Sequence, residues 1–302
     1  MKILAEGLGF PEGPIAMKDG SILLVEIQHG NVTRVRPSGE KQVVAHLGGG
    51  PNGAAIGPDG AVYVCNNGGF EWHRDEHGVR PGRQSMAYGG GRIERVDPVT
   101  GEWSVLYRES PNGPLRGPND IVFDSAGGFW FTDLGKRRER DMDQGGVYYA
   151  RIDGSEIREV IHPMMTPNGI GLSPDGCVLY VAETATGRLW AFAVRAPGEI
   201  DRKPFPSPNG GTLVAGLPGY QLFDSLAVEA DGNICVATLF NGGITTIAPD
   251  GKRIDHTPLP DLFTTNICFG GPDRRTAYVT LSSSGRLIAL DWPRAGLELA
   301  WS

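Results

Sequence analysis

The stretch that decides the fold is PNGIGLSPDGCVLYVA, residues 167–182. Its polar residue Asn168 opens a short strand over 170–172. Pro174-Asp175-Gly176 then predicts a tight turn, because proline presets φ and glycine adopts the positive φ that other residues avoid. The run that follows, 178–182, is made of β-branched, aromatic and other apolar residues suited to a buried strand. The stretch therefore predicts two short strands, the second returning alongside the first.

The same unit occurs six times along the chain. Each copy has a polar residue, a short strand, a turn and an apolar strand, and the copies begin at Pro11, Pro51, Pro118, Pro167, Phe223 and Thr265. Their spacing of roughly 40 to 70 residues is that of propeller blades. In the fullest copy, further strands are predicted at 188–194 and 212–215, which makes four strands per repeat. A strand at 2–6 or one at 297–301 is expected to complete the last blade and close the ring.

The fold class that follows is all-β: a six-bladed β-propeller with four-stranded antiparallel blades around a central channel. The repeats run from end to end, so residues 1–302 are predicted to form a single domain. No segment has sustained helical periodicity.

One position is polar in every copy, the residue just before the inner strand. This polar column holds Glu12, Asn52, Asn119, Asn168, Asp224 and Asn266. Inner strands line the channel of a propeller, so these side chains are expected to converge on its axis. An all-oxygen set with two carboxylates suits a hard divalent cation such as Ca²⁺, Mg²⁺ or Mn²⁺, which would also balance the two charges. The alternative is that these residues only cap local turns, but Glu is a poor turn former and the alignment extends over all six copies.

Composition and missing motifs narrow the other possibilities. The chain has 28 basic and 35 acidic residues and a net charge of −7, which disfavours nucleic acid or an anionic membrane as the main partner. No apolar run is long enough to span a membrane, and residues 1–6 lack the apolar core of a signal peptide. The four cysteines form no CxxC pair, which favours a reducing, cytoplasmic location. No GxSxG, Walker A, HxH or HExxH motif is present, so a histidine-bound zinc site is disfavoured.

Two insertions are expected to lie over the polar end of the channel. The inner strand starts at the polar column and the second strand returns, so loops after second strands emerge on that face. Insertion 66–90 carries aromatic residues and insertion 134–145 carries basic ones: Phe70, Trp72 and Tyr88, and Lys136, Arg137, Arg138 and Arg140. Long loops in compact domains are usually functional or disordered, so a lid or specificity role is expected, with solvated decoration as the alternative. The proline-rich stretch 195–210 follows a third strand and is expected on the opposite face.

Four motifs in this order and phase resemble the gluconolactonase/senescence-marker-protein (regucalcin) family of six-bladed, metal-dependent propellers. They are FPEGP (10–14), RGPNDI (116–121), PNGI (167–170) and FDSL (223–226). The resemblance covers essentially the whole chain. It implies a metal held by Glu12, Asn168 and Asp224, with Asn119 at the metal or on the substrate. It also implies a substrate-binding arginine, for which Arg116 is the candidate, although its offset from Asn119 is one residue longer than in the animal members of the family.

The activity that this resemblance implies is hydrolysis of a lactone, with a sugar lactone such as gluconolactone as the expected substrate. A cation on the axis would polarise the lactone carbonyl and position water. Asp224 would serve as general base or orient the water, and Asn52, Asn119 and Arg116 would bind sugar hydroxyls or the developing oxyanion. The expected ion is Ca²⁺, with Zn²⁺, Mg²⁺, Mn²⁺ and Fe²⁺ as alternatives.

Two other functions stay open. One is a related propeller esterase or phosphotriesterase, which a channel mouth lined by the aromatic residues of insertion 66–90 would favour. The other is a non-enzymatic metal-binding propeller, against which the two aligned carboxylates argue. The expected partner is a small-molecule lactone, with neither nucleic acid nor membrane, and the expected assembly is a monomer or a small homo-oligomer.

Overall fold

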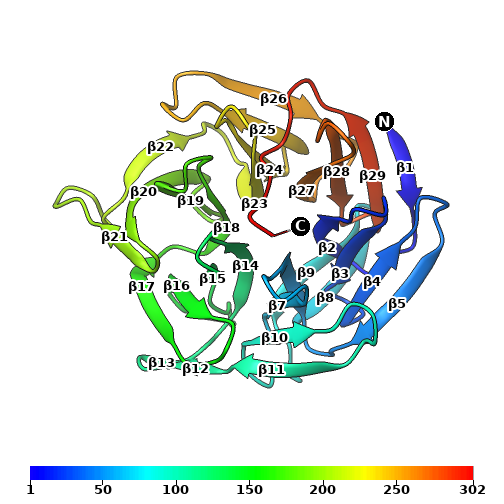
Figure 1. Ribbon diagram of the computed structural model, residues 1–302, viewed down its shortest axis with the longest axis horizontal. Helices are drawn as coiled ribbons and strands as arrows, with labels where there is room; N and C mark the ends of the chain where they lie inside the picture. The colour runs from blue at the N-terminus through cyan, green and yellow to red at the C-terminus, as the bar shows by residue number, and fades with distance from the viewer. Residues whose placement is uncertain (302) are drawn as a thin grey trace.

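The computed structural model describes residues 1–301, which form six antiparallel sheets arranged as blades around a central axis (Figure 1). The predicted six-bladed propeller is therefore confirmed. Within each blade the first strand lies next to the axis and the fourth at the outer edge. Among the described residues, no helix is long and apolar enough to cross a membrane.

The blades follow one another in the sequence. Blade 1 contains β2 (Pro11–Ala16), β3 (Ile22–Glu26), β4 (Asn31–Val35) and β5 (Lys41–His46). Blade 2 contains β6 (Pro51–Ile56), β7 (Val62–Asn66), β10 (Arg92–Val96) and β11 (Trp103–Tyr107). Blade 3 contains β14 (Pro118–Phe123), β15 (Gly128–Asp133), β16 (Gly145–Arg151) and β17 (Ile157–Met164).

The second half repeats this order. Blade 4 contains β18 (Pro167–Leu172), β19 (Val178–Glu183), β20 (Arg188–Ala196) and β22 (Thr212–Gly216), with β21 (Glu199–Asp201) also paired to β20. Blade 5 contains β23 (Leu222–Val228), β24 (Ile234–Leu239), β25 (Gly243–Ile247) and β26 (Ile254–Pro258). Blade 6 contains β27 (Thr264–Gly270), β28 (Thr276–Leu281) and β29 (Arg286–Asp291), and its fourth strand is β1 (Lys2–Ala5).

The ring is closed by the N-terminal strand. β1 pairs antiparallel with β29, so strands from the two ends of the chain share one blade. Of the two candidates predicted to close the ring, the one at residues 2–6 is correct. Residues 297–301 form no strand and lie instead across one mouth of the channel, on the face turned to the viewer in Figure 1.

The turn chemistry expected between inner and second strands is present. In blade 4, Gly176 has a φ of +69°, and Asp175 Oδ1 accepts a hydrogen bond from Cys177 N at 3.0 Å. The following strand, β19, is almost wholly buried. The Asp175-Gly176 pair thus forms the tight turn that connects β18 to β19, as its local chemistry predicts.

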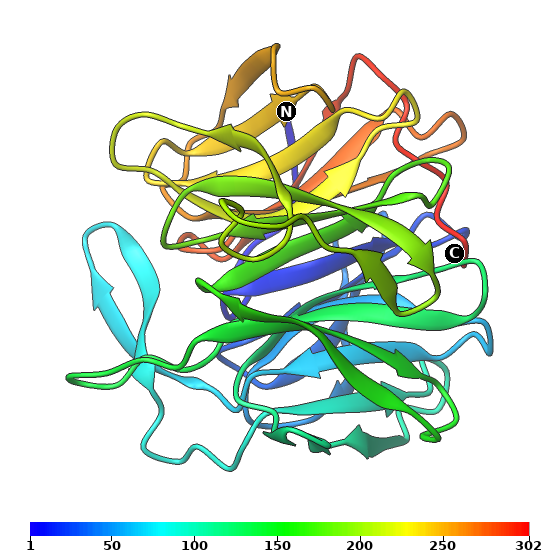
Figure 2. The same ribbon diagram turned by 90° about the vertical axis from the view of Figure 1, so that its left-hand side faces the viewer.

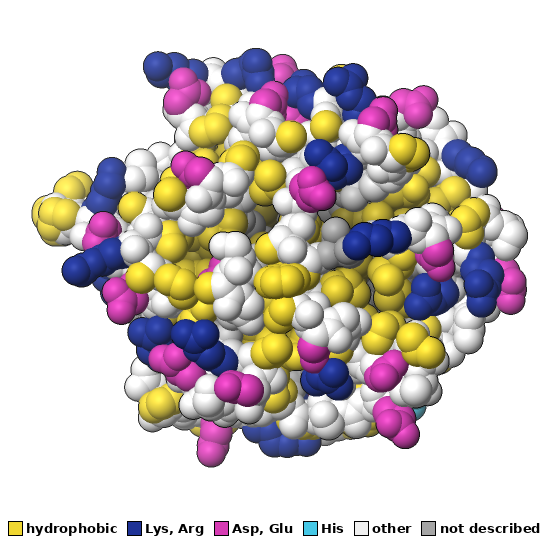
Figure 3. Space-filling model, viewed as in Figure 1, with side chains coloured by type: hydrophobic (Ala, Val, Ile, Leu, Met, Phe, Trp, Pro, Cys, Tyr) yellow, Lys and Arg dark blue, Asp and Glu magenta, His cyan; other side chains and the backbone are white. Residues whose placement is uncertain are grey.

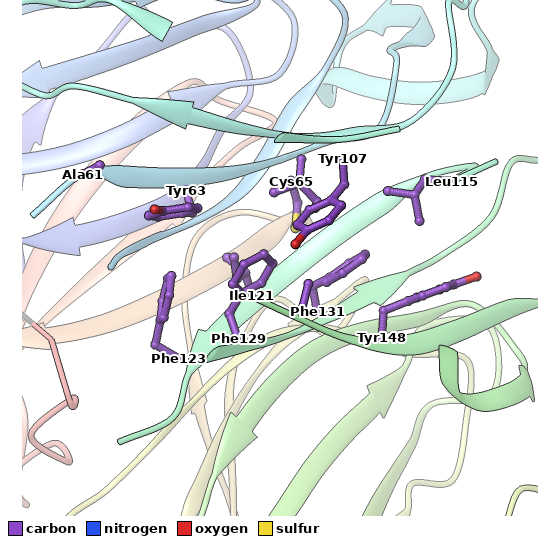
Figure 4. Packing of buried hydrophobic residues seen from close by; sticks show 12 residues of the cluster. Ala61, Tyr63, Cys65, Tyr107, Leu115, Ile121, Phe123, Phe129, Phe131 and Tyr148 are labelled. Atoms are coloured by element: carbon purple, nitrogen blue, oxygen red, sulfur yellow. The ribbon is translucent and has the colours of Figure 1, made fainter. Parts of the chain in front are cut away.

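The hydrophobic core is divided into layers between neighbouring blades. Between blades 2 and 3, for example, Tyr63, Phe123 and Phe129 pack edge to face or tilted, with Tyr63 and Phe123 ring centroids 5.2 Å apart (Figure 4). Buried aromatic side chains are the largest single contributors to such cores. Because each blade buries both faces on its neighbours, the inner strands are held rigidly around the axis.

Two shorter hairpins were not predicted. Insertion 66–90 contains β8 (Phe70–Asp75) paired with β9 (Gly78–Gln84), and β12 (Glu109–Ser110) pairs with β13 (Gly113–Pro114) before blade 3. The β8–β9 hairpin projects from one side of the propeller, opposite to the face that carries residues 297–301 (Figure 2).

Candidate functional site at the axis

Every inner strand contains a β-bulge at the polar column. In blade 1 the pairing with the second strand shifts register between Glu12 and Ile15. The other five blades have equivalent shifts, at Pro51/Ala54, Pro118/Ile121, Pro167/Ile170, Phe223/Leu226 and Thr264/Asn266. A bulge interrupts the strict alternation of side chains along a strand. The repeated bulges therefore release the column residues from the two packed faces of each blade.

The starts of the inner strands also approach one another closely. A Cβ on Gly53 would lie 2.4 Å from Asn119 O, and a Cβ on Gly169 would lie 2.6 Å from Asp224 O. Only glycine permits backbones to come this near. The glycine after the polar residue in the repeated PNG motif thus brings neighbouring polar residues together around the axis.

The column side chains are linked in pairs across blades. Asn266 Nδ2 donates to Glu12 Oε2 at 2.8 Å, and Gly13 N donates to the same oxygen at 2.9 Å. Asn168 Nδ2 donates to Asp224 Oδ1 at 2.6 Å. Asn52 Nδ2 donates to the backbone oxygen of Asn119 at 3.3 Å. Five of the six column residues are buried, and the sixth, Asp224, is partly exposed.

Three carboxyl groups near the axis have raised pKa values. Burial raises the pKa of Glu12 to about 7, against the opposing effect of the hydrogen bond from Asn266. The pKa of Asp120 rises to about 8, through burial and the charge of Glu12. Burial, followed by the charges of Glu12 and Asp120, raises the pKa of Asp224 well above its ordinary value. Mutually repelling carboxyl groups thus share one buried region, an arrangement that a cation would relieve.

The oxygen atoms of the column fit a hard cation. Asn119 Oδ1 is buried and has no hydrogen-bond partner among residues 1–301. Asn168 Oδ1 receives only a long contact, 3.5 Å from Ser225 Oγ. In the described part of the chain, no group of three or more His, Cys, Asp or Glu residues could hold a metal. A cation on this axis would therefore need amide oxygens beside the carboxylates of Glu12 and Asp224, and such mixed oxygen shells suit Ca²⁺.

Asp120 is a site residue that the sequence reasoning missed. It follows Asn119 directly, is 7% exposed, and its Oδ1 accepts a hydrogen bond from Ile121 N at 3.0 Å. The signal was present in the motif Pro118-Asn119-Asp120-Ile121, where a carboxylate takes the position that glycine fills in three other copies. The carboxylate was missed because the six copies were aligned only at the column position, and Asp120 lies one residue after it.

Arg116 lies two residues before the inner strand β14, at the column end of blade 3. Its backbone N donates to Asp133 Oδ2 at 2.7 Å, and its carbonyl oxygen accepts a hydrogen bond from Tyr88 of insertion 66–90 at 2.6 Å. The side chain is exposed, and no hydrogen bond or ion pair holds it within residues 1–301. The backbone is fixed and the guanidinium is left accessible to a ligand.

Both insertions border the column end of the channel, as predicted. Val79 N of the β8–β9 hairpin donates to Ser283 O at 3.0 Å, and Gln84 N donates to Arg137 O of the second insertion at 2.8 Å. Figure 2 places hairpin and second insertion side by side, projecting from the same side of the molecule. Stretch 195–210 begins at the other end of the inner strands, where Arg195 faces the same opening as the turn at Pro174. It then folds back along blade 4, where β21 pairs with β20. The strand directions deduced from the sequence are therefore correct.

Lys136 joins the two insertions. Its side chain is 2% exposed, and Nζ donates to Asn67 O at 2.8 Å and Gly69 O at 2.9 Å. The ammonium also lies 4.1 Å from the centroid of the Phe70 ring, a cation–π distance. Burial lowers the pKa of Lys136 to about 7, although Asp133 and Asp143 oppose this. Lys136 belongs to insertion 134–145, whereas Asn67, Gly69 and Phe70 belong to insertion 66–90.

The charge of insertion 134–145 differs from the basic character predicted for it. Arg138 is bound by Asp141 and Asp143, the latter at 2.8 Å, and Lys136 is buried. The acidic residues of the same loop, Glu139, Asp141 and Asp143, leave a net charge of only +1 when set against its four basic residues. Arg137 and Arg140 are the exposed basic side chains that remain.

Aromatic side chains form an arc on the column face. Neighbouring ring centroids along it lie 5.1–6.2 Å apart, and its members in order are Phe70, Trp72, Phe10, Phe263, Phe240 and Tyr220. Phe10 is two residues from Glu12 and Tyr220 is four from Asp224, so one member of the arc lies just before the inner strand of blade 1 and another just before that of blade 5. Tyr220 is 78% exposed. Only the part of this arc in insertion 66–90 was anticipated from the sequence.

Comparison with known proteins finds similarity over most of the chain. The family description "SMP-30/Gluconolactonase/LRE-like region" matches residues 10–283. Lactonase drp35 of Staphylococcus haemolyticus is 30% identical over 267 residues, covering 86% of this chain and 72% of that protein. A gluconolactonase of Zymomonas mobilis is 27% identical over 308 residues, covering 89% and 76%. A calcium-binding regucalcin from Agrobacterium tumefaciens shares the fold, with a TM-score of 0.75, 20% identity and coverage of 98% and 94%.

Proposed function

This chain belongs to the SMP-30/gluconolactonase/LRE-like family, and we propose that it is an enzyme that hydrolyses lactones at the axial site. The observation that carries the proposal is the convergence of Glu12, Asp224 and the amides of the column from six separate blades, each through its own β-bulge. A scaffold protein has no need for buried, mutually repelling carboxyl groups at its centre. The similarity to lactonases of two bacterial genera supports the reaction class.

A divalent cation completes the proposed site. Glu12, Asn168 and Asp224 would hold it, with Asn119 offering the buried Oδ1 that has no protein partner among the described residues. Ca²⁺ is the ion that this oxygen set suits first. When bound, such a cation supplies a Lewis acid that polarises a carbonyl and lowers the pKa of water.

The residues of the chain have distinct roles in the proposed reaction. Asp224 accepts the proton of the water that adds to the lactone carbonyl, and the hydrogen bond from Asn168 Nδ2 to Asp224 Oδ1 fixes the orientation of that carboxylate. The ring C–O bond then breaks, the proton passes to the leaving alkoxide, and the product is a hydroxy acid. Asn52, Asn119 and Arg116 bind the substrate, with the exposed guanidinium of Arg116 suited to the carboxylate that forms.

The substrate class is a choice between two chemistries. The amides of the column suit the hydroxyl groups of an aldonolactone, the substrate expected from the sequence. The aromatic arc with its exposed Tyr220 suits a lactone or aryl ester that carries an apolar arm. The arc keeps the second candidate open, since aromatic side chains around a mouth favour apolar substituents.

The test is a panel of lactones followed with a pH indicator, with and without chelator. It includes aldonolactones, alkyl-substituted and aromatic lactones, and an aryl ester. We expect chelator-sensitive hydrolysis of at least one lactone, lost in Asp224→Asn and Glu12→Gln. Asp175→Asn is the matched control, because Asp175 lies in an exposed turn at the other end of the inner strands. Absence of lactone hydrolysis at saturating metal would overturn the proposal, and hydrolysis of the aryl ester alone would replace it with the esterase alternative.

A further inference from the structure

Thr132 of β15 lies opposite the bulge in the inner strand of blade 3. The pairing of β14 with β15 shifts register at this point, so this one threonine faces two residues of the inner strand, Asn119 and Asp120. Its side chain is fully buried. A bulge interrupts the ladder and leaves backbone groups that need other partners. A hydroxyl at this position can supply such a partner.

The Thr132 hydroxyl connects two of the residues proposed to hold the cation. Its Oγ1 accepts a hydrogen bond from Asp120 N, the amide of the peptide bond that follows Asn119, at 3.1 Å. The same hydroxyl donates to the backbone oxygen of Asn168, in blade 4, at 2.7 Å. A threonine hydroxyl has a single hydrogen to donate, and here that hydrogen goes to the next blade. One buried group thus fixes the backbone of Asn119 relative to that of Asn168.

A second threonine fixes the side chain of Asn168. Asn168 Nδ2 donates to Thr184 Oγ1 at 3.0 Å and to Asp224 Oδ1 at 2.6 Å, so both of its hydrogens have acceptors. The amide oxygen is then the end that remains for a ligand, since it receives only the long contact from Ser225. In the opposite orientation of the amide, its oxygen would face the carboxylate of Asp224. Thr184 and Asp224 therefore select the orientation that a cation needs.

The position that faces the bulge differs between blades. Opposite the bulges of β18 and β23 it holds Ala182 and Ala237, whose side chains form no hydrogen bonds. In blade 2 it holds Cys65, whose thiol makes a weak contact of 3.7 Å with Asp120 O. The blade therefore does not require a hydroxyl at this position. The hydroxyl of blade 3 has a local role, which its contact with the next blade identifies.

The two ends of the channel are built differently. On the face opposite the column, apolar side chains gather around the central opening (Figure 3). The inner strands contribute Ile56, Val122 and Leu172 to this part of the channel. Neighbouring inner strands thus meet through apolar contacts at that end. At the column end they are tied by directional hydrogen bonds, which fix orientation as well as distance.

We propose that Thr132 and Thr184 are positioning residues of the axial site. Thr132 fixes the backbone of Asn168 against that of Asn119, and Thr184 holds the amide of Asn168 with its oxygen free for the cation. The inference rests on the cation site of the proposed function, but it concerns affinity for the ion and not the choice of substrate. Loss of a hydrogen-bonding partner of a metal ligand typically weakens metal binding by about 10–100-fold.

The experiment measures the Kd of the intact, metal-free chain for Ca²⁺ by calorimetry, with Mn²⁺ as a second probe. Thr132→Val keeps the shape of the side chain and removes the hydroxyl, whereas Thr132→Ser keeps the hydroxyl. Thr238→Val is the matched control, because Thr238 is also fully buried but its hydroxyl bonds Val236 O at 3.2 Å and Thr245 Oγ1 at 2.7 Å, within its own blade. We expect the Kd to rise at least about tenfold in Thr132→Val and to stay near that of wild type in Thr132→Ser and Thr238→Val.

Thermal melting of the metal-free proteins separates affinity from stability. Thr132→Val and Thr238→Val should both lower the Tm, because each leaves buried polar groups without a partner. Only Thr132→Val should also lose affinity for the ion. An equal rise in Kd in Thr238→Val would reduce the effect to stability and overturn the inference.

Thr184→Val covers the case in which Thr132→Val does not fold, because Thr184 is only half-buried. It should likewise raise the Kd at least about tenfold, with Thr184→Ser close to wild type. A Kd equal to that of wild type in either folded valine variant would overturn the role of that threonine and leave the cation site in place. If wild type bound neither Ca²⁺ nor Mn²⁺, the cation site itself would be overturned, and this inference with it.

Discussion

Replacement of Lys136 by methionine should change how the stability of the protein depends on pH. Lys136 is buried, and its pKa is lowered to about 7 because burial disfavours the ammonium. In the unfolded chain the same group titrates near 10.4. Between these two values the unfolded chain binds one more proton than the folded one, so stability rises with pH. Below pH 7 the lysine is charged in both states, and this gain is absent.

The magnitude follows from the two pKa values. Linkage gives a gain of about 2 kcal/mol in the free energy of unfolding between pH 7 and pH 9 from this one group. Methionine has similar length and no titrating group. It also leaves Asn67 O and Gly69 O without their donor, at a cost of about 1–3 kcal/mol each that does not vary with pH. The difference between wild type and Lys136→Met should therefore grow by about 2 kcal/mol from pH 7 to pH 9.

The assay is urea unfolding followed by tryptophan fluorescence at pH 7, 8 and 9. Glu12 and Asp120 also titrate near this range, with the opposite sign: their pKa values are raised on folding, so their contribution is lost as pH rises through about 7 and 8. They are present in both proteins and cancel in the difference. Lys252→Met, at a side chain 85% exposed, is the control and should give a flat difference. A flat or shrinking difference for Lys136→Met would refute the reasoning.

Four further outcomes are expected. Asp224→Asn should lower kcat at least about a hundredfold, the scale of a general-base contribution, measured at saturating metal; near-normal turnover would exclude Asp224 as base. The affinity for Ca²⁺ should rise between pH 5.5 and pH 7.5, because Glu12, with a pKa of about 7, must release its proton to bind the cation. Calorimetry in two buffers would detect the protons released on binding, and a pH-independent Kd would contradict this. Neutralising Arg137 and Arg138 together should raise KM for an acidic lactone more than for a neutral one. Arg137 should be responsible for most of the effect, since Arg138 is already paired with Asp143. Equal effects on the two substrates would show that neither arginine contacts the substrate. Tyr220→Ser should raise KM for an aryl-substituted lactone several-fold, by the roughly 1 kcal/mol of a lost aromatic contact, while leaving gluconolactone unchanged; parallel changes would remove the arc from substrate binding.

Much of the architecture could be read from the chain alone. The six copies fix the number of blades, because each copy carries its own turn, its own apolar strand and its own polar residue. Local chemistry suffices for these features: Asp175 and Gly176 form a tight turn through the aspartate hydrogen bond and the positive φ of glycine, without contacts from distant residues. Strand direction then follows, and it correctly placed insertions 66–90 and 134–145 at one end and the start of stretch 195–210 at the other. The polar column and the residues proposed for the site were likewise available from the aligned copies.

Tertiary structure decided whatever depends on contacts between distant residues. The bulge at each column position arises where an inner strand meets its partner, and no single copy predicts it. Asn168 meets Asp224 across 56 residues, and Lys136 reaches Asn67 across 69. A lysine in a basic loop looks solvent-exposed in sequence, and only the packing of two insertions buries it. The segment 297–301 is a similar case: it carries a strand-like pattern, but β1 already occupies the edge of blade 6, so these residues cross one mouth of the channel instead.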